Sequence, residues 1–368
     1  MTSKERVLAA LRGKNIDRLP WSPNLAYWWE SQSASFKKQG EIAFLDQIGA
    51  DGFIRGHVPF DEKPPKNLII VKLKYKHSTY KLEQKKDTRI ETYKTPVGSL
   101  QSVYTYSASG NTWFLTEHPV KTAEDFKILE YLKSDASPIE DFSILDELQS
   151  DLGERALIVP LFIQEMKSSF QALIEYWVGT EALVYALYDY PEIVLNTLES
   201  MRRLNRACLK VALRSNAEGF ISWEDTSTTN ISPDYYINYI VPEINDWCDL
   251  IHKENKFYIQ HACGTLKDLI QIIGESKIDC IESISPPPTG NIELWDARKH
   301  LPEYIALIGG IEPTVFKNAG MAEFSLYIDQ LLEKMEGSRY ILANSDSCPP
   351  GVSLEKFMYV SKRIRQPQ

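Results

Sequence analysis

The sequence predicts an α/β protein whose parallel strands and covering helices form a (β/α)8 TIM barrel. Short runs that are apolar throughout alternate with longer helical patterns in the second half of the chain, as in a parallel sheet that is covered on both faces. Three apolar runs in the first half extend this rhythm, and eight strands are the number in such a barrel. An open doubly wound sheet is the alternative, but its glycine-rich dinucleotide fingerprint is absent.

The predicted strands are apolar segments, most of which are followed by a helical pattern. They are residues 19–21, 51–55, 157–161, 219–223, 257–260, 279–284, 304–309 and 339–343. The helical patterns of the second half are residues 232–253, 265–274, 292–300, 322–335 and the segment from 353.

Residues of about 62–135 interrupt this rhythm with an alternating, β-rich pattern. Segments 72–75, 89–93 and 99–106 alternate in polarity, and the turn residues 95–98 separate two of them, which is typical of antiparallel strands. We therefore expect an antiparallel β-rich insertion after the second strand, within a single domain that spans the whole chain.

Composition and charge exclude several classes of protein. The 368 residues are 43% apolar and 25% charged, and no run approaches the roughly 18 apolar residues of a membrane span. The net charge is −9 and the basic residues are scattered, which argues against nucleic acid or an anionic membrane as a partner. The N-terminus has no apolar signal segment, and five cysteines without such a signal indicate reduced thiols. We expect a cytoplasmic protein.

Reactive side chains follow the predicted strands, where the active site of a parallel barrel gathers. His261 and Cys263 form a His-x-Cys pair after the fifth strand, and Cys348 follows the eighth. An imidazole and two thiolates suit zinc, and three protein ligands leave a fourth position open for chemistry. The spacing alone also allows the alternative that these cysteines end strands by chance. The other three cysteines lie in apolar patterns that are typical of core thiols.

Five short motifs are spread along the chain from near the N-terminus to the last predicted strand. They are the opening residues 3–13, Asp-Arg-Leu-Pro at 17–20, Thr-Pro-Val-Gly-Ser-Leu at 95–100, Ile-Ser-Pro at 231–233 and Gly-Gly-Ile-Glu-Pro at 309–313. In these motifs the chain resembles the uroporphyrinogen decarboxylase superfamily over essentially its whole length. The resemblance implies a (β/α)8 barrel, in agreement with the strand count.

The first loop separates two branches of this superfamily. Decarboxylases of the family carry an Arg-Gln-Ala-Gly-Arg loop that grips the carboxylates of the substrate, whereas residues 21–29 here contain no arginine. A polyanionic tetrapyrrole would then lose its bidentate, charge-assisted contacts. The chain instead resembles the cobamide-dependent (corrinoid) methyltransferases, such as methylcobamide:coenzyme M methyltransferase. Their zinc signature, His-x-Cys with a distant Cys, is matched by His261, Cys263 and Cys348.

This resemblance implies methyl transfer between a corrinoid and a small thiol or methyl-ether substrate. Zinc (Zn2+) would hold the thiolate that attacks a methyl group on cobalt, or would act as a Lewis acid on the oxygen of a methyl ether. The chain lacks an Asp-x-His-x-x-Gly cobalamin motif, so a corrinoid protein is the expected partner. Two other classes stay open: a metal-free decarboxylase or lyase that uses Asp225 and a tyrosine, and a non-catalytic corrinoid-binding barrel.

The remaining residues at the strand ends are candidates for catalysis and substrate binding. Glu282 is the first candidate for the open zinc position, and its alternative role is to hold the His261 ring. Glu224 is the second candidate, and Asp225 joins them as a catalytic residue, although both are equally suited to hydrogen bonding at the rim. The aromatic run at 27–29 either stacks on the corrin or substrate or forms an apolar helix face. The expected substrate contacts are Asn24, His57 and Gln164.

Overall fold

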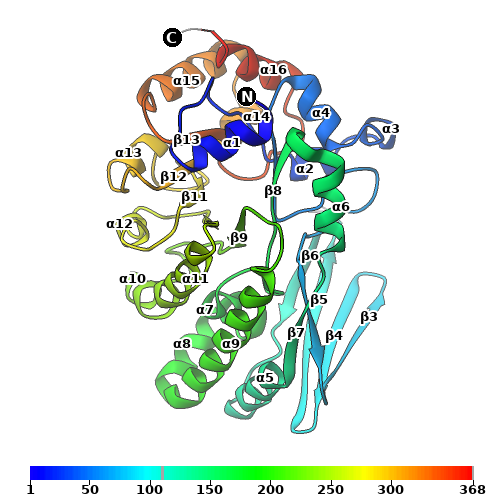
Figure 1. Cartoon of the computed structure of the whole chain (residues 1–368). Helices are drawn as coiled ribbons and strands as arrows, with labels where there is room; N and C mark the ends of the chain where they lie inside the picture. Colours follow the sequence, from blue (N-terminus) through cyan, green and yellow to red (C-terminus); the bar gives the residue numbers. More distant parts are fainter. Residues whose placement is uncertain (109–111, 367–368) are drawn as a thin grey trace. The chain divides into compact units, whose positions relative to one another are not determined.

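The computed structural model describes residues 1–108 and 112–366 and shows a mixed α/β fold (Figure 1). The chain divides into two compact units, each assembled from segments that are distant in sequence. The first unit comprises Met1–Ile70, Phe142–Leu161 and Asn216–Gln368, and the second comprises Val71–Asp141 and Phe162–Ser215. Among the described residues, no helix is both long enough and apolar enough to cross a membrane.

Five parallel strands form the main sheet of the first unit, in the order β13-β12-β11-β10-β9. They are β9 (Gly219–Trp223), β10 (Phe257–His261), β11 (Cys280–Ile284), β12 (Ala306–Ile311) and β13 (Tyr340–Asn344). All their residues are buried except the half-buried Trp223, as expected for parallel strands that are covered on both faces. The five apolar runs predicted in the second half of the chain are therefore confirmed as strands.

Two more predicted strands of the first unit pair with each other. β1 (Gly52–Arg55) and β8 (Ala156–Val159) form a parallel pair, and all their residues are buried. The first predicted strand, residues 19–21, is reduced to one bridge, in which Trp21 lies parallel to Leu342 of β13.

Single backbone hydrogen bonds lie at the edges of these two sheets. The amide of Asp51, just before β1, donates to the carbonyl of Trp21 over 2.6 Å. The amide of Ile221 in β9 donates to the carbonyl of Pro160, just after β8, over 3.2 Å. The regular ladders themselves make one five-stranded and one two-stranded parallel sheet.

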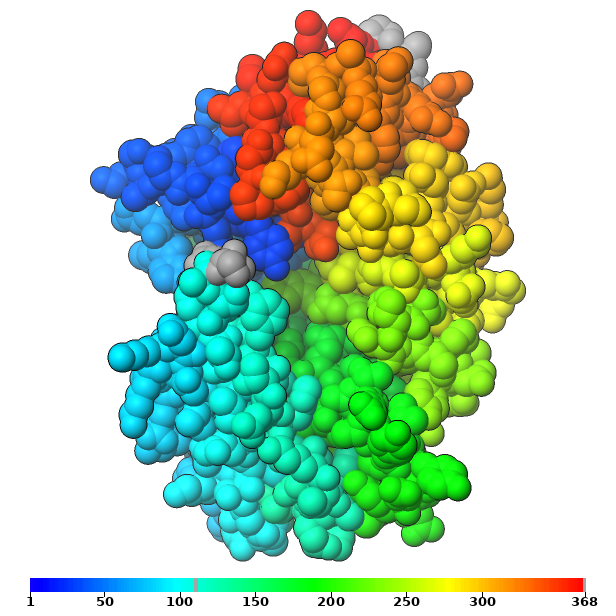
Figure 2. Space-filling view, turned by 180° about the vertical axis from the view of Figure 1, so that it is seen from behind, coloured from blue at the N-terminus to red at the C-terminus, as the bar shows by residue number. Residues whose placement is uncertain are grey.

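The helices of the first unit lie in the connections between these strands and near the two ends of the chain. They are α1 (Ser3–Leu11), α2 (Ala26–Glu30), α3 (Ala34–Lys37), α4 (Glu41–Ile48), α6 (Ser143–Leu152), α10 (Pro233–Tyr235), α11 (Val241–Lys253), α12 (Ile270–Gly274), α13 (Leu294–Arg298), α14 (Pro313–Asn318), α15 (Met321–Lys334) and α16 (Leu354–Arg363), with short segments η1 (Gly153–Arg155) and η3 (Tyr236–Ile240). Thr2 and Glu5 form a capping box at the start of α1. α16 packs against α4, so C-terminal residues lie beside N-terminal ones, as the red and blue surfaces of Figure 2 show.

Antiparallel strands make up the first part of the second unit. They are β2 (Val71–Tyr75), which pairs with β7 (Ala136–Glu140), and the sheet of β3 (Thr79–Lys85), β4 (Thr88–Thr95), β5 (Gly98–Ser107) and β6 (Thr112–Glu117). The strands expected within residues 72–106 are present. Residues Ala123–Asp135, expected in the β-rich segment, instead form helix α5, because a capping box at Thr122 starts a helix whose buried residues recur every three positions.

Helices complete the second unit with a segment that the sequence did not assign to it. Residues 162–215 carry α7 (Ser169–Ala172), η2 (Leu173–Trp177), α8 (Thr180–Asp189) and α9 (Pro191–Ala212). α9 packs against both α5 and β7, so this stretch shares a core with the antiparallel strands. The single domain with an insertion of about 62–135 stays a prediction.

A buried carboxylate fixes the start of β1 in the first unit. Asp51 accepts hydrogen bonds from the guanidinium groups of Arg6 (2.6 Å) and Arg18 (2.8 and 2.9 Å). It also accepts from the backbone amide of Trp21 (3.1 Å) and the hydroxyl of Ser3 (3.2 Å). Because Asp51 is fully buried, its charge depends on these donors for stabilisation.

Replacing Asp51 with Asn should destabilise the protein strongly. The amide would leave the Arg6 and Arg18 guanidinium groups without their buried counter-charge, and breaking a buried ion pair in this way costs about 3–5 kcal/mol. The free energy of unfolding in urea at pH 7 measures the effect. The matched control is Asp46→Asn, because Asp46 pairs with Arg155 at the exposed surface and should lose at most about 1 kcal/mol. Equal losses in both variants would contradict this account of the network.

Candidate metal centre

A cavity of about 380 Å³ opens at the carboxyl ends of the first unit's strands. Its walls include the last residues of β1, β9 and β10 and the residues just after β13. A larger cavity, of about 560 Å³, lies around the start of β13, and its described lining residues include neither histidine nor cysteine. The smaller cavity, which histidine and carboxylate side chains line, is therefore the candidate site. The predicted site residues that line it are Asn24, His57, Asp225, His261 and Glu282.

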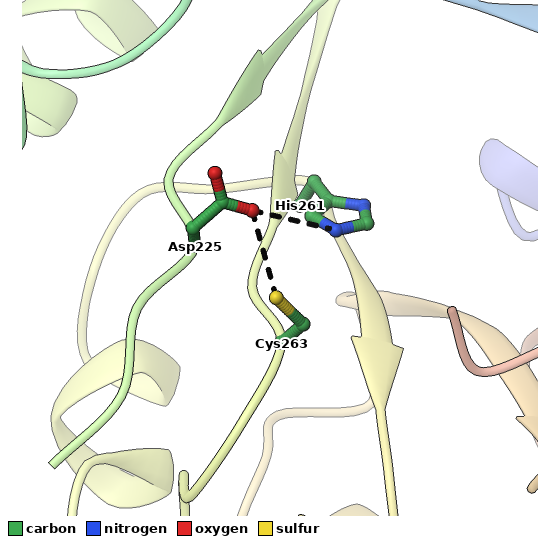
Figure 3. A group of neighbouring side chains, drawn as sticks. All are labelled: Asp225, His261 and Cys263. Carbon is green, nitrogen blue, oxygen red and sulfur yellow. Dashed lines mark hydrogen bonds and ion pairs between the residues drawn. The ribbon is translucent and has the colours of Figure 1, made fainter. Parts of the chain in front are cut away.

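Three potential metal ligands converge beside this cavity. Asp225, on the loop after β9, points its carboxylate toward His261 and Cys263 at the end of β10 (Figure 3). Its Oδ1 atom lies 3.5 Å from Cys263 Sγ and 3.9 Å from His261 Nε2. One ligand atom from each of the three residues lies within 4.8 Å of the others. An imidazole, a thiol and a carboxylate are all donors that zinc accepts, so this group could hold a metal ion.

Strand register explains the orientation of the imidazole. His261 of β10 is the direct neighbour of Glu282 in the parallel strand β11, so both side chains project on the same face. His261 Nδ1 donates to Glu282 Oε2 over 2.9 Å, and the hydroxyl of Ser283 lies 3.4 Å from the same nitrogen. This contact leaves Nε2 directed at Asp225. A carboxylate that fixes one imidazole nitrogen while the other faces a metal is a common arrangement.

An arginine holds the other oxygen of Glu282. Arg55 Nε, from the end of β1, lies 2.7 Å from Glu282 Oε1, and the Arg55 guanidinium also rests 4.9 Å from the centre of the Phe53 ring. Burial raises the pKa of Glu282, but the charge of Arg55 and the hydrogen bond and charge of His261 together outweigh burial, so the pKa ends below its ordinary value. Glu282 is therefore ionised at neutral pH and accepts the His261 proton.

Burial and local charges also shift the pKa values of the neighbouring groups. Burial lowers the pKa of His261, but hydrogen bonds to Cys263 and Glu282 outweigh it and raise the pKa well above its ordinary value. Burial raises the pKa of the Cys263 thiol. It also raises the pKa of Asp346, to which the charge of Asp225 adds. A cation bound among these groups would stabilise the negatively charged forms of Cys263 and Asp346, which burial disfavours.

Cys348 lies outside this group of ligand atoms. Cys348 lies just after β13, and its backbone amide donates to the carbonyl of Asn24 over 2.8 Å. Its sulfur lies 3.9 Å from the carbonyl of Pro349. The side chain is fully buried, and burial raises the pKa of its thiol well above the ordinary value. Among the described residues, Asp225 and not Cys348 completes the group around His261 and Cys263. The zinc-ligand role of Cys348 stays a prediction.

Of the other expected site residues, Asn24 and His57 line the cavity, whereas Glu224 and Gln164 do not. Asn24 lines the cavity while its backbone pairs with the Asn344 side chain. His57 lines it with Nε2 held 3.0 Å from Glu41 Oε2 and its ring stacked on Phe60. Glu224 is fully buried and accepts a 2.7 Å hydrogen bond from Ser222. Gln164 belongs to the second unit, where it donates to Val71 O over 2.6 Å.

The aromatic run at 27–29 is divided between surface and core. Trp28 and Trp29 are buried, and both rings contact Phe44. Tyr27 is 58% exposed and lines the cavity. Sequence reasoning also assigned no role to Arg55, although an arginine at the end of a wholly apolar strand was an available signal.

A family model described as uroporphyrinogen decarboxylase (URO-D) matches residues 117–366. The chain belongs to this family. The superfamily predicted from the sequence motifs is thereby confirmed. Among solved structures, a methyltransferase from Methanosarcina mazei is similar over 98% of both chains, with a TM-score of 0.60 and 11% identity, which shows a shared fold.

A second solved structure, from Listeria monocytogenes, bears the name vitamin-B12 independent methionine synthase. The similarity covers 62% of this chain and 69% of the Listeria chain. Its TM-score is 0.38 and its identity 14%. A search of curated protein sequences gives no match.

Replacing Arg55 with Met should destabilise this member of the family, because Glu282 would lose the cation that holds one of its buried oxygens. Since His261 still contacts the other oxygen, we expect the lower end of the about 3–5 kcal/mol range for broken buried pairs. The free energy of unfolding in urea measures the loss. An exposed pair provides the control: Arg214→Met, next to Glu140, should lose at most about 1 kcal/mol.

The same loss should depend on pH. Arg55 lowers the pKa of Glu282 in the folded protein, so its stabilisation is complete above the ordinary glutamate pKa of about 4.3 and disappears as the pH falls below it. Without Arg55, burial raises the pKa of Glu282, so the folded variant takes up a proton at higher pH than the wild type, and the difference between the wild type and Arg55→Met should narrow as the pH falls from 7 toward 3. A constant difference from pH 7 to pH 3 would contradict the assigned pair.

Proposed function

We propose that the protein is a zinc-dependent methyltransferase of the uroporphyrinogen decarboxylase superfamily. The observation that carries this proposal is the convergence of Asp225, His261 and Cys263 beside a cavity at the strand ends. The similar structure from Methanosarcina mazei bears the name of a methyltransferase, which supports the same class. The proposed reaction moves a methyl group between a corrinoid, held by a partner protein, and a thiol or methyl-ether substrate.

The donor set fits zinc on the evidence of its own contacts. His261 Nδ1 is engaged by Glu282, so Nε2 is the nitrogen available to a metal. Cys263 Sγ and Asp225 Oδ1 lie 3.5 Å apart. For comparison, bond lengths of about 2.3 Å to sulfur and 2.0 Å to oxygen at a tetrahedral angle also give about 3.5 Å. His261 at the end of β10, Cys263 two residues after it, and one or two ligands from neighbouring loops would complete the coordination.

Each residue then has a defined role. His261 and Cys263 hold the metal, and Cys348 is proposed as a further ligand. When bound, zinc stabilises a substrate thiolate or polarises a methyl-ether oxygen. Arg55 and Glu282 hold the imidazole in one orientation.

The cavity walls supply the proposed substrate contacts. Asn24 and His57 line the cavity together with the exposed ring of Tyr27, which offers a flat apolar surface beside the metal ligands. Gln164 and Glu224 do not line this cavity, and their roles in substrate binding and catalysis stay predictions from the sequence.

We also propose that the first unit forms the (β/α)8 barrel of this family. The Trp21 bridge to β13 and the hydrogen bond from Asp51 to Trp21 support closure on one side. The hydrogen bond from Ile221 to Pro160 supports it between β9 and β8. A closed ring of eight parallel segments would bring all their carboxyl ends to one mouth.

Zinc content should separate ligands from core thiols. We expect about one zinc per chain in wild-type protein purified without chelators, and loss of most of it in Cys263→Ala and Cys348→Ala. Cys280→Ala is the matched control for Cys348→Ala, because both thiols are fully buried. It should lose about 1 kcal/mol of stability through a small cavity and keep its zinc. Elemental analysis measures zinc per chain, and equal zinc in all variants would contradict the site.

Turnover tests the proposed reaction directly. With free methylcobalamin and 2-mercaptoethanol, the wild-type protein should slowly convert the methylcobalamin absorption spectrum to that of demethylated cobalamin. Cys263→Ala should abolish this conversion, since it removes a proposed metal ligand. If no corrinoid or corrinoid protein supports turnover with thiols or aryl methyl ethers, the methyltransferase proposal is wrong.

Decarboxylation of uroporphyrinogen should be absent. The cavity carries the acidic groups of Asp225, Glu282 and Asp346, while its one arginine, Arg55, is engaged by Glu282. A substrate with eight carboxylates would meet like charge without a bidentate partner. Chromatography of the reaction products provides the measurement. Formation of coproporphyrinogen by the purified protein would instead favour a decarboxylase.

A further inference from the structure

We propose that strand β3 pairs with β3 of a second copy of this chain, so that the four-stranded sheets of two copies join across a two-fold axis. The proposal concerns the second unit and goes beyond the proposed function, because no residue of β3 lines the cavity of the candidate site.

β3 is an edge strand whose outer side has no partner strand in the part of the chain that the structure describes. It ends the order β3-β4-β5-β6 and pairs only with β4 (Figure 1). All seven of its residues, Thr79–Lys85, are exposed. The strand contains neither proline nor a bulge, which are features that commonly prevent pairing at an edge. Its outer row of N–H and C=O groups is therefore available to another strand.

The hairpin of β3 and β4 fixes which backbone groups point outward. Its two-residue loop joins Lys85 to Thr88, which face each other in the ladder, and such a closing pair exchanges both hydrogen bonds. Hydrogen-bonded pairs alternate with non-hydrogen-bonded pairs along an antiparallel ladder. The amides and carbonyls of Tyr80, Leu82 and Gln84 therefore point away from β4, and a new strand must pair with these three residues.

Charge selects one register among the antiparallel pairings that use these groups. When the pairing is centred on Leu82, Lys81 of each copy lies opposite Glu83 of the other. Centring it on Lys81 or on Glu83 places like charges opposite each other, which is destabilising. Centring it on Tyr80 or on Gln84 overlaps only three of the seven strand residues. The register centred on Leu82 is therefore the one that suits both the backbone and the charges.

The side chains on the two faces of β3 also suit this register. Leu82 is 50% exposed, and the two-fold axis would bring the Leu82 side chains of both copies together and remove apolar surface from water. On the other face, Lys81 and Glu83 form an exposed ion pair at 3.0 Å. Lysines at a sheet edge ordinarily repel further strands, whereas each Lys81 here would meet a glutamate of the second copy.

The predicted dimer is weak and closed. One pair of seven-residue strands is small beside the roughly 1,200–2,000 Å² that stable interfaces bury, and each new backbone hydrogen bond replaces one to water. We therefore expect a dissociation constant of about 100 µM. Because a two-fold contact uses the same edge of both copies, association should stop at the dimer.

The test measures the association of the full-length protein and locates the contact. Sedimentation velocity at about 5–500 µM spans the expected dissociation constant, and hydrogen exchange read by mass spectrometry follows the peptide that contains β3. The variants are Lys81→Glu, Glu83→Lys and the double variant with both changes. The matched controls are Lys127→Glu and Glu124→Lys, which make the same changes of charge in an exposed pair on α5.

We expect the wild type to pass from monomer to dimer with rising concentration, while exchange in the β3 peptide slows. By symmetry, each single variant at Lys81 or Glu83 replaces two pairs of opposite charge with two pairs of like charge, so it should weaken dimerisation about tenfold or more. The double variant restores opposite charges across the axis and should return to within about threefold of the wild type. Both α5 controls should match the wild type.

Three results would overturn the proposal. The first is a wild type that stays monomeric up to about 500 µM, five times the expected dissociation constant. The second is a dimer that leaves exchange in the β3 peptide unchanged, or that neither single variant at Lys81 or Glu83 weakens. The third is assemblies larger than a dimer, because these require an unlike edge, such as β6, as the partner of β3.

Discussion

The buried contacts from Arg55 through Glu282 to His261 are the constraint on which the site depends. Three strands contribute one residue each, and the carboxylate in the middle is engaged at both oxygens. Because Glu282 accepts the Nδ1 proton, the opposite nitrogen of His261 faces Asp225 and the cavity. A freely rotating imidazole would have to be ordered at each metal-binding event, whereas this one is already oriented.

Strand β1 links this constraint to the stability of the first unit. Asp51, just before the strand, is held by two arginines and the Trp21 amide. Arg55 ends the same strand and reaches Glu282. Two buried carboxylates therefore fix both ends of a four-residue strand. Burial makes each charge unfavourable alone, so each pairing also limits where its partners can lie.

The division of roles among the acidic residues follows from their exposure. Glu282 and Glu224 are buried among donors, while Asp225 lies on a loop that borders the cavity. Buried carboxylates whose oxygens accept hydrogen bonds orient their neighbours, whereas the half-exposed carboxylate of Asp225 is open to molecules in the cavity. Residues of similar chemistry at the same rim therefore differ in what they can contact.

The sequence by itself determined the parallel strands of the first unit, the superfamily and the presence of His261 and Cys263 at a strand end. These follow from local patterns, since an apolar run and the residues that end it are contiguous in the chain. Only the tertiary structure decided that Glu282 contacts His261, that Arg55 holds Glu282, and that Asp225 rather than Cys348 lies within the ligand group. Those contacts depend on strand register and loop conformation, which are set by packing between segments that are distant in sequence.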